Sequence, residues 1–235
     1  MFENRLNKFL VISFLVLIIG LPLGIGIGAN ITKSNNECIE SYKQTIKELR
    51  YENDSLRKII DNVELSLEII EEISTWMDSK TKKHSLCPAT IFQLSVKHDV
   101  DVRLLLSQGW VESHFGTAGI AARTNSVFNV GAFDGFAYSE ICKTYKYSHP
   151  NESIEPYLWL IRNEYLGSEK NEQHLLRNFV NLSGSRYATY PNYERNIGNV
   201  WREIDNTTKL DSLLMMHADL KHQQLSIQID SPHSI

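Results

Sequence analysis

The chain has 235 residues, of which 42% are hydrophobic and 22% are charged, and its formal net charge at pH 7 is -4. This composition is ordinary for a folded protein and provides enough chain for one medium-sized domain with accessory segments. Because no excess of basic residues is available to release counterions from phosphates, the charge argues against a general nucleic-acid-binding protein. Three cysteines are too few for a disulfide scaffold, and neither they nor the histidines show metal-ligand spacing, so we expect no metal and no other cofactor.

The first predicted element is a membrane anchor in residues 1–36, with a transmembrane helix over about residues 9–31. This run contains no charged residue, and its length is sufficient to cross a bilayer. A cleaved signal peptide and a buried core helix are the alternatives. Two basic residues precede the run and only Lys33 closely follows it, which predicts a single-pass protein with a cytoplasmic N-terminus and an extracytoplasmic domain at the bacterial cytoplasmic membrane. If the domain is exported, Cys87 and Cys142 are the expected disulfide pair.

Residues 37–73 are predicted to form a coiled-coil stalk. Their apolar side chains recur with a period of about 3.5 residues, and the opposite face is charged. Isoleucine at a positions with leucine at d positions favours a parallel homodimer, and Asn53 would set its register. The alternative is a single amphipathic helix that folds back on the domain, and residues 74–85, with three lysines, are predicted to be a polar linker. The a positions are Ile39, Ile46, Asn53, Ile60 and Leu67, and the d positions are Tyr42, Leu49, Leu56, Val63 and Ile70.

An apolar helix is predicted next, between an N-cap at Asp101 and a C-cap at Gly116, and it carries Glu112 near its end. The negative end of the helix dipole and the flanking aromatic rings would both raise the pKa of Glu112. A raised pKa suits a general acid, whereas the alternative is an ordinary surface glutamate near a helix end. The carboxyl group would lean over the turn that contains Gln108 and Gly109, where the missing side chain of the glycine would leave room for a ligand.

The globular domain is predicted to extend from residue 86 to residue 205 and to be mostly α-helical. A short helix precedes the one that carries Glu112, and amphipathic helices are predicted around residues 154–165, 175–182 and 193–204. Residues 117–147 lack a helical period, and a loop of this length is expected to line a cleft. Residues 206–235 are predicted to be a tail that is partly helical or disordered.

Four segments carry motifs in a fixed order. They read VESHFGT at 111–117, ARTNSVFNV at 122–130, YS at 147–148 and RYATYPNY at 186–193. In this order they resemble the motifs of the glucosaminidase family of bacterial and phage cell-wall hydrolases, which belongs to the lysozyme-like superfamily. The resemblance covers about half of the chain.

The resemblance implies a lysozyme-like helical fold and a peptidoglycan glycan strand as substrate, cleaved at a β-1,4 bond between N-acetylglucosamine and N-acetylmuramic acid. It implies that Glu112 is the catalytic acid and that Tyr187 lines the catalytic centre. Asn125 would hold the loop beside the catalytic helix, and Phe128 would pack beneath the cleft. The residues expected to contact or shape the substrate site are Gln108, Asn125, Phe128, Tyr147 and Tyr190.

The sequence departs from the family pattern at Ser126, which replaces the second asparagine of a motif, at Asn129, where glycine is usual, and at Tyr190, where an aspartate is usual. Glu140 is the candidate for a second catalytic carboxylate, with Asp134 as the other nearby one, and neither lies in a matching motif. A second carboxylate would activate water or form a covalent intermediate. Without it, Glu112 would act as acid and then as base while the substrate's own acetamido or 6-hydroxyl group attacks, and the second variant is lytic transglycosylation, which forms 1,6-anhydro ends.

Two other classes of function remain as alternatives. A membrane-anchored scaffold would bind glycan through the same domain without cutting it. A thiol peptidase would use Cys142 and His149, but no orienting asparagine or aspartate motif accompanies this pair.

Overall fold

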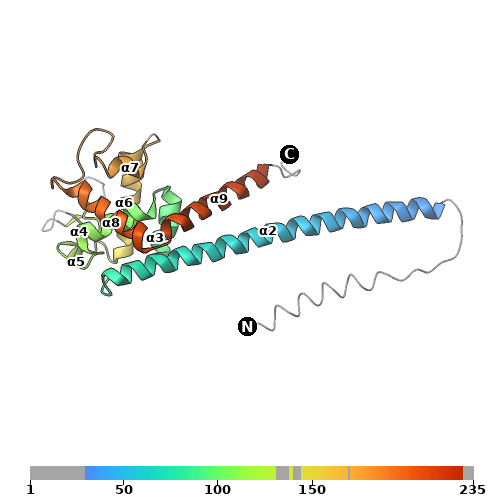
Figure 1. The fold of residues 1–235 in the computed structure, drawn as a ribbon, viewed down its shortest axis with the longest axis horizontal. Coiled ribbons are helices and arrows are strands. Elements are labelled where there is room, and N and C mark those ends of the chain that lie inside the picture. Colours follow the sequence, from blue (N-terminus) through green and yellow to red (C-terminus); the bar gives the residue numbers. More distant parts are fainter. Residues whose placement is uncertain (1–29, 131–137, 140–143, 169, 230–235) are drawn as a thin grey trace. The chain divides into compact units, whose positions relative to one another are not determined.

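The computed structural model describes residues 30–130, 138–139, 144–168 and 170–229 (Figure 1). The chain divides into two compact units, residues 1–56 and residues 57–235. The transmembrane segment predicted at 9–31 lies almost entirely outside the described residues, and Asp134, Glu140 and Cys142 lie outside them as well. Among the helices that are described, none has an apolar stretch that would span a bilayer.

The described part of the chain is mostly helical, as predicted. One long helix, α2, is followed by the elements of the globular domain, and the two short strands pair antiparallel with Tyr138 opposite Tyr145. The elements are α2 (Asn30–Lys80), α3 (Pro88–His98), α4 (Val102–Ser113), α5 (Ala121–Thr124), β1 (Tyr138–Ser139), β2 (Thr144–Tyr145), the 3-10 helix η2 (Pro150–Ser153), α6 (Ile154–Leu160), the π-helix η3 (Ile161–Leu166), α7 (Glu172–Leu175), α8 (Tyr193–Thr207) and α9 (Leu210–Ile229).

Helix α2 contains the predicted heptads, and their apolar side chains from Ile39 to Leu67 are exposed, whereas Ile70 is partly buried against the core. Every residue from Ile39 to Leu56 is exposed, and Val63 and Leu67 further along the helix are exposed by 54% and 60%. Exposed apolar side chains along a helix of this length would be stabilised by a second helix that covers them. The parallel dimer stays a prediction.

A second apolar stripe of α2 packs into the core of the globular domain. Leu65, Ile69 and Ile73 are buried together with residues from the domain helices. At about 100° per residue, Leu65 lies roughly 200° around the helix from Val63. The last part of α2 therefore does fold onto the domain, and apart from Ile70 it uses a different face from the one that carries the heptads.

The linker predicted at 74–85 is helical up to Lys80, so this prediction is wrong for its first half. Trp76 is only 3% exposed and packs into the core. The ammonium group of Lys80 forms an ion pair with Glu203 of α8 and lies 5.4 Å from the ring centroid of Trp110 of α4. The polar composition of the segment conceals these anchoring contacts.

Helix α4 is the central helix of the domain and packs most extensively against α8. The six consecutive residues Leu104–Gly109 are all buried, as is typical of a helix that is covered on every side. Its N-cap is Asp101, as predicted, because the Asp101 carboxylate accepts a hydrogen bond from the main-chain nitrogen of Arg103 at 2.8 Å.

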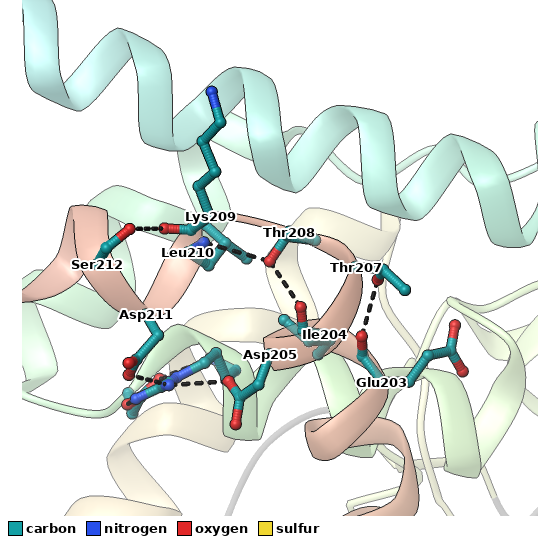
Figure 2. A network of polar contacts seen from close by, with 11 residues as sticks. Glu203, Ile204, Asp205, Thr207, Thr208, Lys209, Leu210, Asp211 and Ser212 are labelled. Atoms are coloured by element: carbon teal, nitrogen blue, oxygen red, sulfur yellow. Dashed lines mark hydrogen bonds and ion pairs between the residues drawn. The ribbon is translucent and has the colours of Figure 1, made fainter.

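Arg103 joins the start of α4 to α8 and α9. Its guanidinium donates to Asp101, to Asp205 at 2.9 Å and to Asp211 at 2.5 Å, and it lies 4.7 Å from the ring centroid of Trp201. Asp205 and Asp211 lie near each other where α8 passes into α9 (Figure 2). Burial lowers the pKa of Arg103, but the three carboxylates outweigh it and raise the pKa, so the guanidinium stays charged.

The tail predicted after residue 205 begins as an ordered part of the domain. Leu210 and Leu213 of α9 are buried against the core. The side-chain hydroxyl of Thr208 accepts a hydrogen bond from the main-chain nitrogen of Leu210 at 3.2 Å, and Figure 2 shows this contact at the entry to α9.

Candidate active site

The end of α4 is tied to a neighbouring loop by Ser113. Its hydroxyl donates to the carbonyl oxygen of Val127 at 2.7 Å and accepts from the main-chain nitrogen of Gly116 at 2.8 Å. The helix ends at His114, which has a left-handed conformation (φ 51°), rather than at the predicted Gly116 cap. This turn places Glu112 in the last turn of α4, beside the loop that contains Val127.

Glu112 has both carboxyl oxygens occupied by protein donors. Oε1 accepts from the hydroxyl of Tyr193 at 2.5 Å, and Oε2 accepts from Nδ2 of Asn129 at 3.2 Å. Burial raises the pKa of Glu112, and the hydrogen bonds from Tyr193 and Asn129 oppose this rise without cancelling it. The direction of the shift is the one expected from the sequence. Such a carboxyl group retains its proton at a higher pH than an exposed glutamate does.

Tyr193, at the start of α8, is the contact that the sequence did not reveal. Its hydroxyl accepts a hydrogen bond from Nε2 of Gln108 at 2.8 Å, and Oε1 of Gln108 in turn accepts from the hydroxyl of Tyr157. Gln108 was expected to touch the substrate, but its side chain is fully buried and lies between the two tyrosines. The only signal that pointed to Tyr193 is its place at the end of the RYATYPNY motif.

Gly109 does not leave room for a ligand, contrary to the expectation from the sequence. A Cβ atom at this position would lie 3.2 Å from the ring of Phe115 and 3.4 Å from the ring of Phe128. Phe128 is fully buried and stacks on Tyr157 with ring centroids 3.8 Å apart. The space next to Gly109 is therefore filled by the rings of Phe115 and Phe128, which pack against α4.

Tyr187 lies next to the site, beside Tyr193. Its hydroxyl donates to the carbonyl oxygen of Phe128 at 2.8 Å, and its ring stacks on that of Tyr193 at 5.8 Å between centroids, with an interplanar angle of 13°. Tyr190, three residues further on, is 55% exposed and thus accessible to a ligand. The geometry gives Tyr187 a part in holding Tyr193, and the catalytic part expected for it stays a prediction.

The sequence profile of the Glucosaminidase family, described as mannosyl-glycoprotein endo-β-N-acetylglucosaminidase, matches residues 89–206. The chain belongs to this family. The match spans half of the chain and includes the end of α4 and the start of α8, which carry Glu112 and Tyr193. Membership confirms the resemblance seen in the motifs and indicates a glycosidase of the cell-wall hydrolase type. No curated protein matches the chain.

Asn125 of the glucosaminidase domain holds the segment that enters η2. Its Nδ2 donates to the carbonyl oxygens of Tyr147 and Ser148 at 2.9 and 3.2 Å, and the main-chain nitrogen of Tyr147 donates to Thr124 at 2.8 Å. These contacts hold the segment before η2, and the role of Asn125 in the loop beside the catalytic helix stays a prediction. Tyr147 is partly buried against the core, so it shapes the domain near the α5 segment.

Asn129 occupies the position where the glucosaminidase family usually has glycine, and it keeps a backbone that glycine favours. Its φ angle is 50°, in the left-handed region that asparagine tolerates better than most residues. The side chain adds a contact that glycine lacks, because Nδ2 reaches both the main-chain oxygen and Oε2 of Glu112, each at 3.2 Å. The departure from the family pattern thus lies within the site itself.

Neither Glu140 nor Asp134 belongs to the described residues, so a second catalytic carboxylate stays a prediction. Within the described residues, no group of three or more histidine, cysteine, aspartate or glutamate side chains could hold a metal ion. Cys87 has a free thiol at the start of α3, and its predicted partner Cys142 lies outside the described residues.

Proposed function

We propose that the domain is a peptidoglycan hydrolase that cleaves a β-1,4 bond between N-acetylglucosamine and N-acetylmuramic acid, with Glu112 as the general acid. The observation that supports this role is the environment of the Glu112 carboxyl group. Burial favours its protonated form, and donors on both oxygens favour the carboxylate that remains once the proton has left. A group balanced in this way can give up a proton and take one back within a single reaction cycle.

In the proposed reaction, Glu112 protonates the glycosidic oxygen as the bond to the anomeric carbon breaks. If Glu140 or Asp134 supplies a second carboxylate, that carboxylate takes the proton of the attacking water. If Glu112 acts alone, the acetamido oxygen of the substrate attacks the anomeric carbon and displaces the leaving sugar. The Glu112 carboxylate then accepts a proton from the water that opens this intermediate. An attack by the substrate's 6-hydroxyl group would make the enzyme a lytic transglycosylase.

Mass spectrometry of peptidoglycan digested by the full-length chain separates these reactions. Hydrolysis leaves a reducing N-acetylglucosamine or N-acetylmuramic acid end and so identifies the bond, whereas transglycosylation leaves a 1,6-anhydro end. We expect a reducing end, and we expect no product from the Glu112→Gln variant. Absence of any product with the unmodified chain would contradict the proposal and favour a glycan-binding scaffold.

We also propose that the protein is anchored in the bacterial cytoplasmic membrane by its N-terminal segment and forms a parallel homodimer through α2. The exposed heptad side chains support the dimer, since they are apolar and recur from Ile39 to Leu67. In a parallel dimer, Glu52 at a g position is placed to pair with Arg57 at an e position of the second copy. The glucosaminidase domain would then act on the glycan strands outside the membrane.

A further inference from the structure

A chain of three hydrogen bonds runs through the core of the domain and ends on Glu112. The hydroxyl of Tyr157 donates to Oε1 of Gln108, Nε2 of Gln108 donates to the hydroxyl oxygen of Tyr193, and the Tyr193 hydroxyl donates to Oε1 of Glu112. The four residues come from α4, α6 and α8, so these hydrogen bonds link helices that are far apart in the sequence. Tyr157 and Gln108 are fully buried and Tyr193 is 4% exposed, so water does not compete with these bonds.

The direction of this hydrogen-bond chain is fixed at its buried end. Tyr157 has a single hydroxyl hydrogen, and Oε1 of Gln108 accepts it. The amide nitrogen of Gln108 must then face Tyr193, because an amide has one acceptor side and one donor side. A rotation of the Gln108 amide would leave the buried Tyr157 hydrogen without its acceptor, which is unfavourable in a site that excludes water.

The same direction decides which oxygen of Glu112 can carry a proton. The hydroxyl oxygen of Tyr193 accepts from Gln108, so its own hydrogen is directed at Oε1 of Glu112. A proton on Oε1 would make it a hydroxyl oxygen, which accepts the hydrogen of Tyr193 less well than a carbonyl oxygen does. Oε2 has no such obstacle, since its contact with Asn129 is longer, at 3.2 Å, and Nδ2 of Asn129 is shared with the main-chain oxygen of Glu112.

We infer that Tyr193 and Asn129 are positioning residues that hold the two carboxyl oxygens of Glu112, and that Oε2 is the oxygen that carries the transferred proton. The inference rests on the proposed role of Glu112 as the proton donor. In the protonated state, Oε1 is the carbonyl oxygen and accepts from Tyr193, while the hydrogen on Oε2 is delivered to the leaving oxygen of the sugar. After the transfer both oxygens are charged, and both have a donor in place.

The donor to Oε2 of Glu112 comes from Asn129, at a position where the family usually has glycine. A glycine at this position would adopt the same left-handed backbone but would leave Oε2 without a donor from residue 129. The Asn129→Gly substitution therefore removes one donor while preserving the backbone that the loop requires. Tyr157→Phe is the complementary variant, because its hydroxyl donates to Gln108, at the far end of the hydrogen-bond chain from the Glu112 carboxyl group.

The test is infrared spectroscopy of the full-length chain, in which the carbonyl stretch of protonated Glu112 is isolated by subtracting the spectrum of the Glu112→Gln variant. If the proton is on Oε2, the carbonyl oxygen is Oε1, and Tyr193→Phe removes its hydrogen bond. We expect Tyr193→Phe to shift the stretch to higher frequency and Asn129→Gly to shift it much less. The reverse order would place the proton on Oε1 and overturn the inference.

Titration of the same band reports the pKa of Glu112. Loss of a donor to the carboxylate raises it, so we expect a higher pKa in Tyr193→Phe and Asn129→Gly, and an upward shift of the alkaline limb of the pH–rate profile in both. Tyr157→Phe removes no donor to the carboxylate and only weakens the hydrogen-bond chain behind Tyr193, so we expect a smaller rise there. Tyr187→Phe is the matched control for the pKa, because this neighbouring hydroxyl donates to Phe128 instead. An unchanged pKa of Glu112 in both Tyr193→Phe and Asn129→Gly would overturn the inference. Full activity of Glu112→Gln would instead overturn the proposed function, and the infrared comparison would still show which oxygen of Glu112 carries the proton.

Discussion

Replacing Arg103 by methionine tests how the core of the domain holds α4. Methionine keeps much of the aliphatic stem and removes the guanidinium, which donates to Asp101, Asp205 and Asp211. The side chains of Arg103 and Asp101 are only 13% and 21% exposed, so this charged hydrogen-bonded pair contributes about 1.5–3 kcal/mol. The carboxylates of Asp205 and Asp211 are 34% and 58% exposed, so solvent screening reduces each to about 0.2–1 kcal/mol.

The contact of the guanidinium with the ring of Trp201 adds about 0.5–1 kcal/mol. Because interactions at one side chain are not additive, we expect Arg103→Met to lower the free energy of unfolding by about 3 kcal/mol. For a folded unit of this size the loss corresponds to a fall in Tm of roughly 6–12 °C.

Thermal unfolding of the full-length chain, followed by near-ultraviolet circular dichroism, measures this change because the signal reports tertiary packing. Arg202→Met is the matched control. Among the described residues, the Arg202 guanidinium bonds only to Gly198 and Asn199 within α8, so its loss is expected to cost less than about 0.5 kcal/mol. Equal Tm values for Arg103→Met and Arg202→Met would refute the reasoning that Arg103 joins the three helices.

Three further predictions concern pH, assembly and the second carboxylate. Because burial raises the pKa of Glu112, the folded state binds more protons than the unfolded state above the ordinary glutamate range, and ionised Glu112 therefore destabilises the fold at pH 7. Glu112→Gln should then have a higher Tm than the unmodified chain at pH 7 and the same Tm below about pH 4. A difference in Tm that stays constant across this range would contradict the pKa shift. The chain should sediment as a dimer, and Asn53→Ile should strengthen association while loosening the choice of oligomer, whereas a monomer at tens of micromolar would exclude the α2 dimer. Glu140→Gln should reduce activity as strongly as Glu112→Gln if water is activated by a second carboxylate, and normal activity would support the route through Glu112 alone.

Local sequence patterns correctly predicted those helices whose buried side chains can be recognised from the spacing of apolar residues. The helix that carries Glu112 and its N-cap at Asp101 were correct, because a helix covered on all sides shows a nearly continuous apolar run after a capping residue. The helix expected at 175–182 was wrong. Only Glu172–Leu175 is helical, since Phe179 is buried in an irregular segment whose main-chain nitrogen donates to Glu194 of α8 at 3.1 Å. This long-range contact outweighs local helix propensity.

Helix α2 shows a second limit of periodicity. The heptad positions form the regular stripe in the sequence, yet the side chains that pack into the domain are Leu65, Ile69, Ile73 and Trp76 on another face. Both sets have helical spacing, so the sequence alone cannot say which stripe meets the domain and which remains exposed. That choice depends on the shape of the surface formed by the domain helices.

The site was predictable in its central residue but not in its contacts. The position of Glu112 near a helix end and the motifs around it identified the carboxyl group, whereas its bond to Tyr193 joins residues 81 apart in the chain. Gln108 was expected to face the substrate because it precedes Glu112 by one turn. Its burial between Tyr157 and Tyr193 results from the packing of α8 on α4, which no local pattern encodes.

The most direct test of the account is the rate at which the full-length chain releases fragments from purified peptidoglycan, compared between the unmodified protein, Glu112→Gln and Glu172→Gln. Burial raises the pKa of Glu172 as well, but this carboxylate accepts a hydrogen bond from the main-chain nitrogen of Asp101 and belongs to α7, so it serves as a matched buried carboxyl group. We predict that Glu112→Gln lowers the rate by on the order of 10²- to 10⁴-fold and that Glu172→Gln retains activity wherever it stays folded. A folded Glu112→Gln protein that cleaves peptidoglycan at the unmodified rate would contradict the central claim that Glu112 supplies the proton.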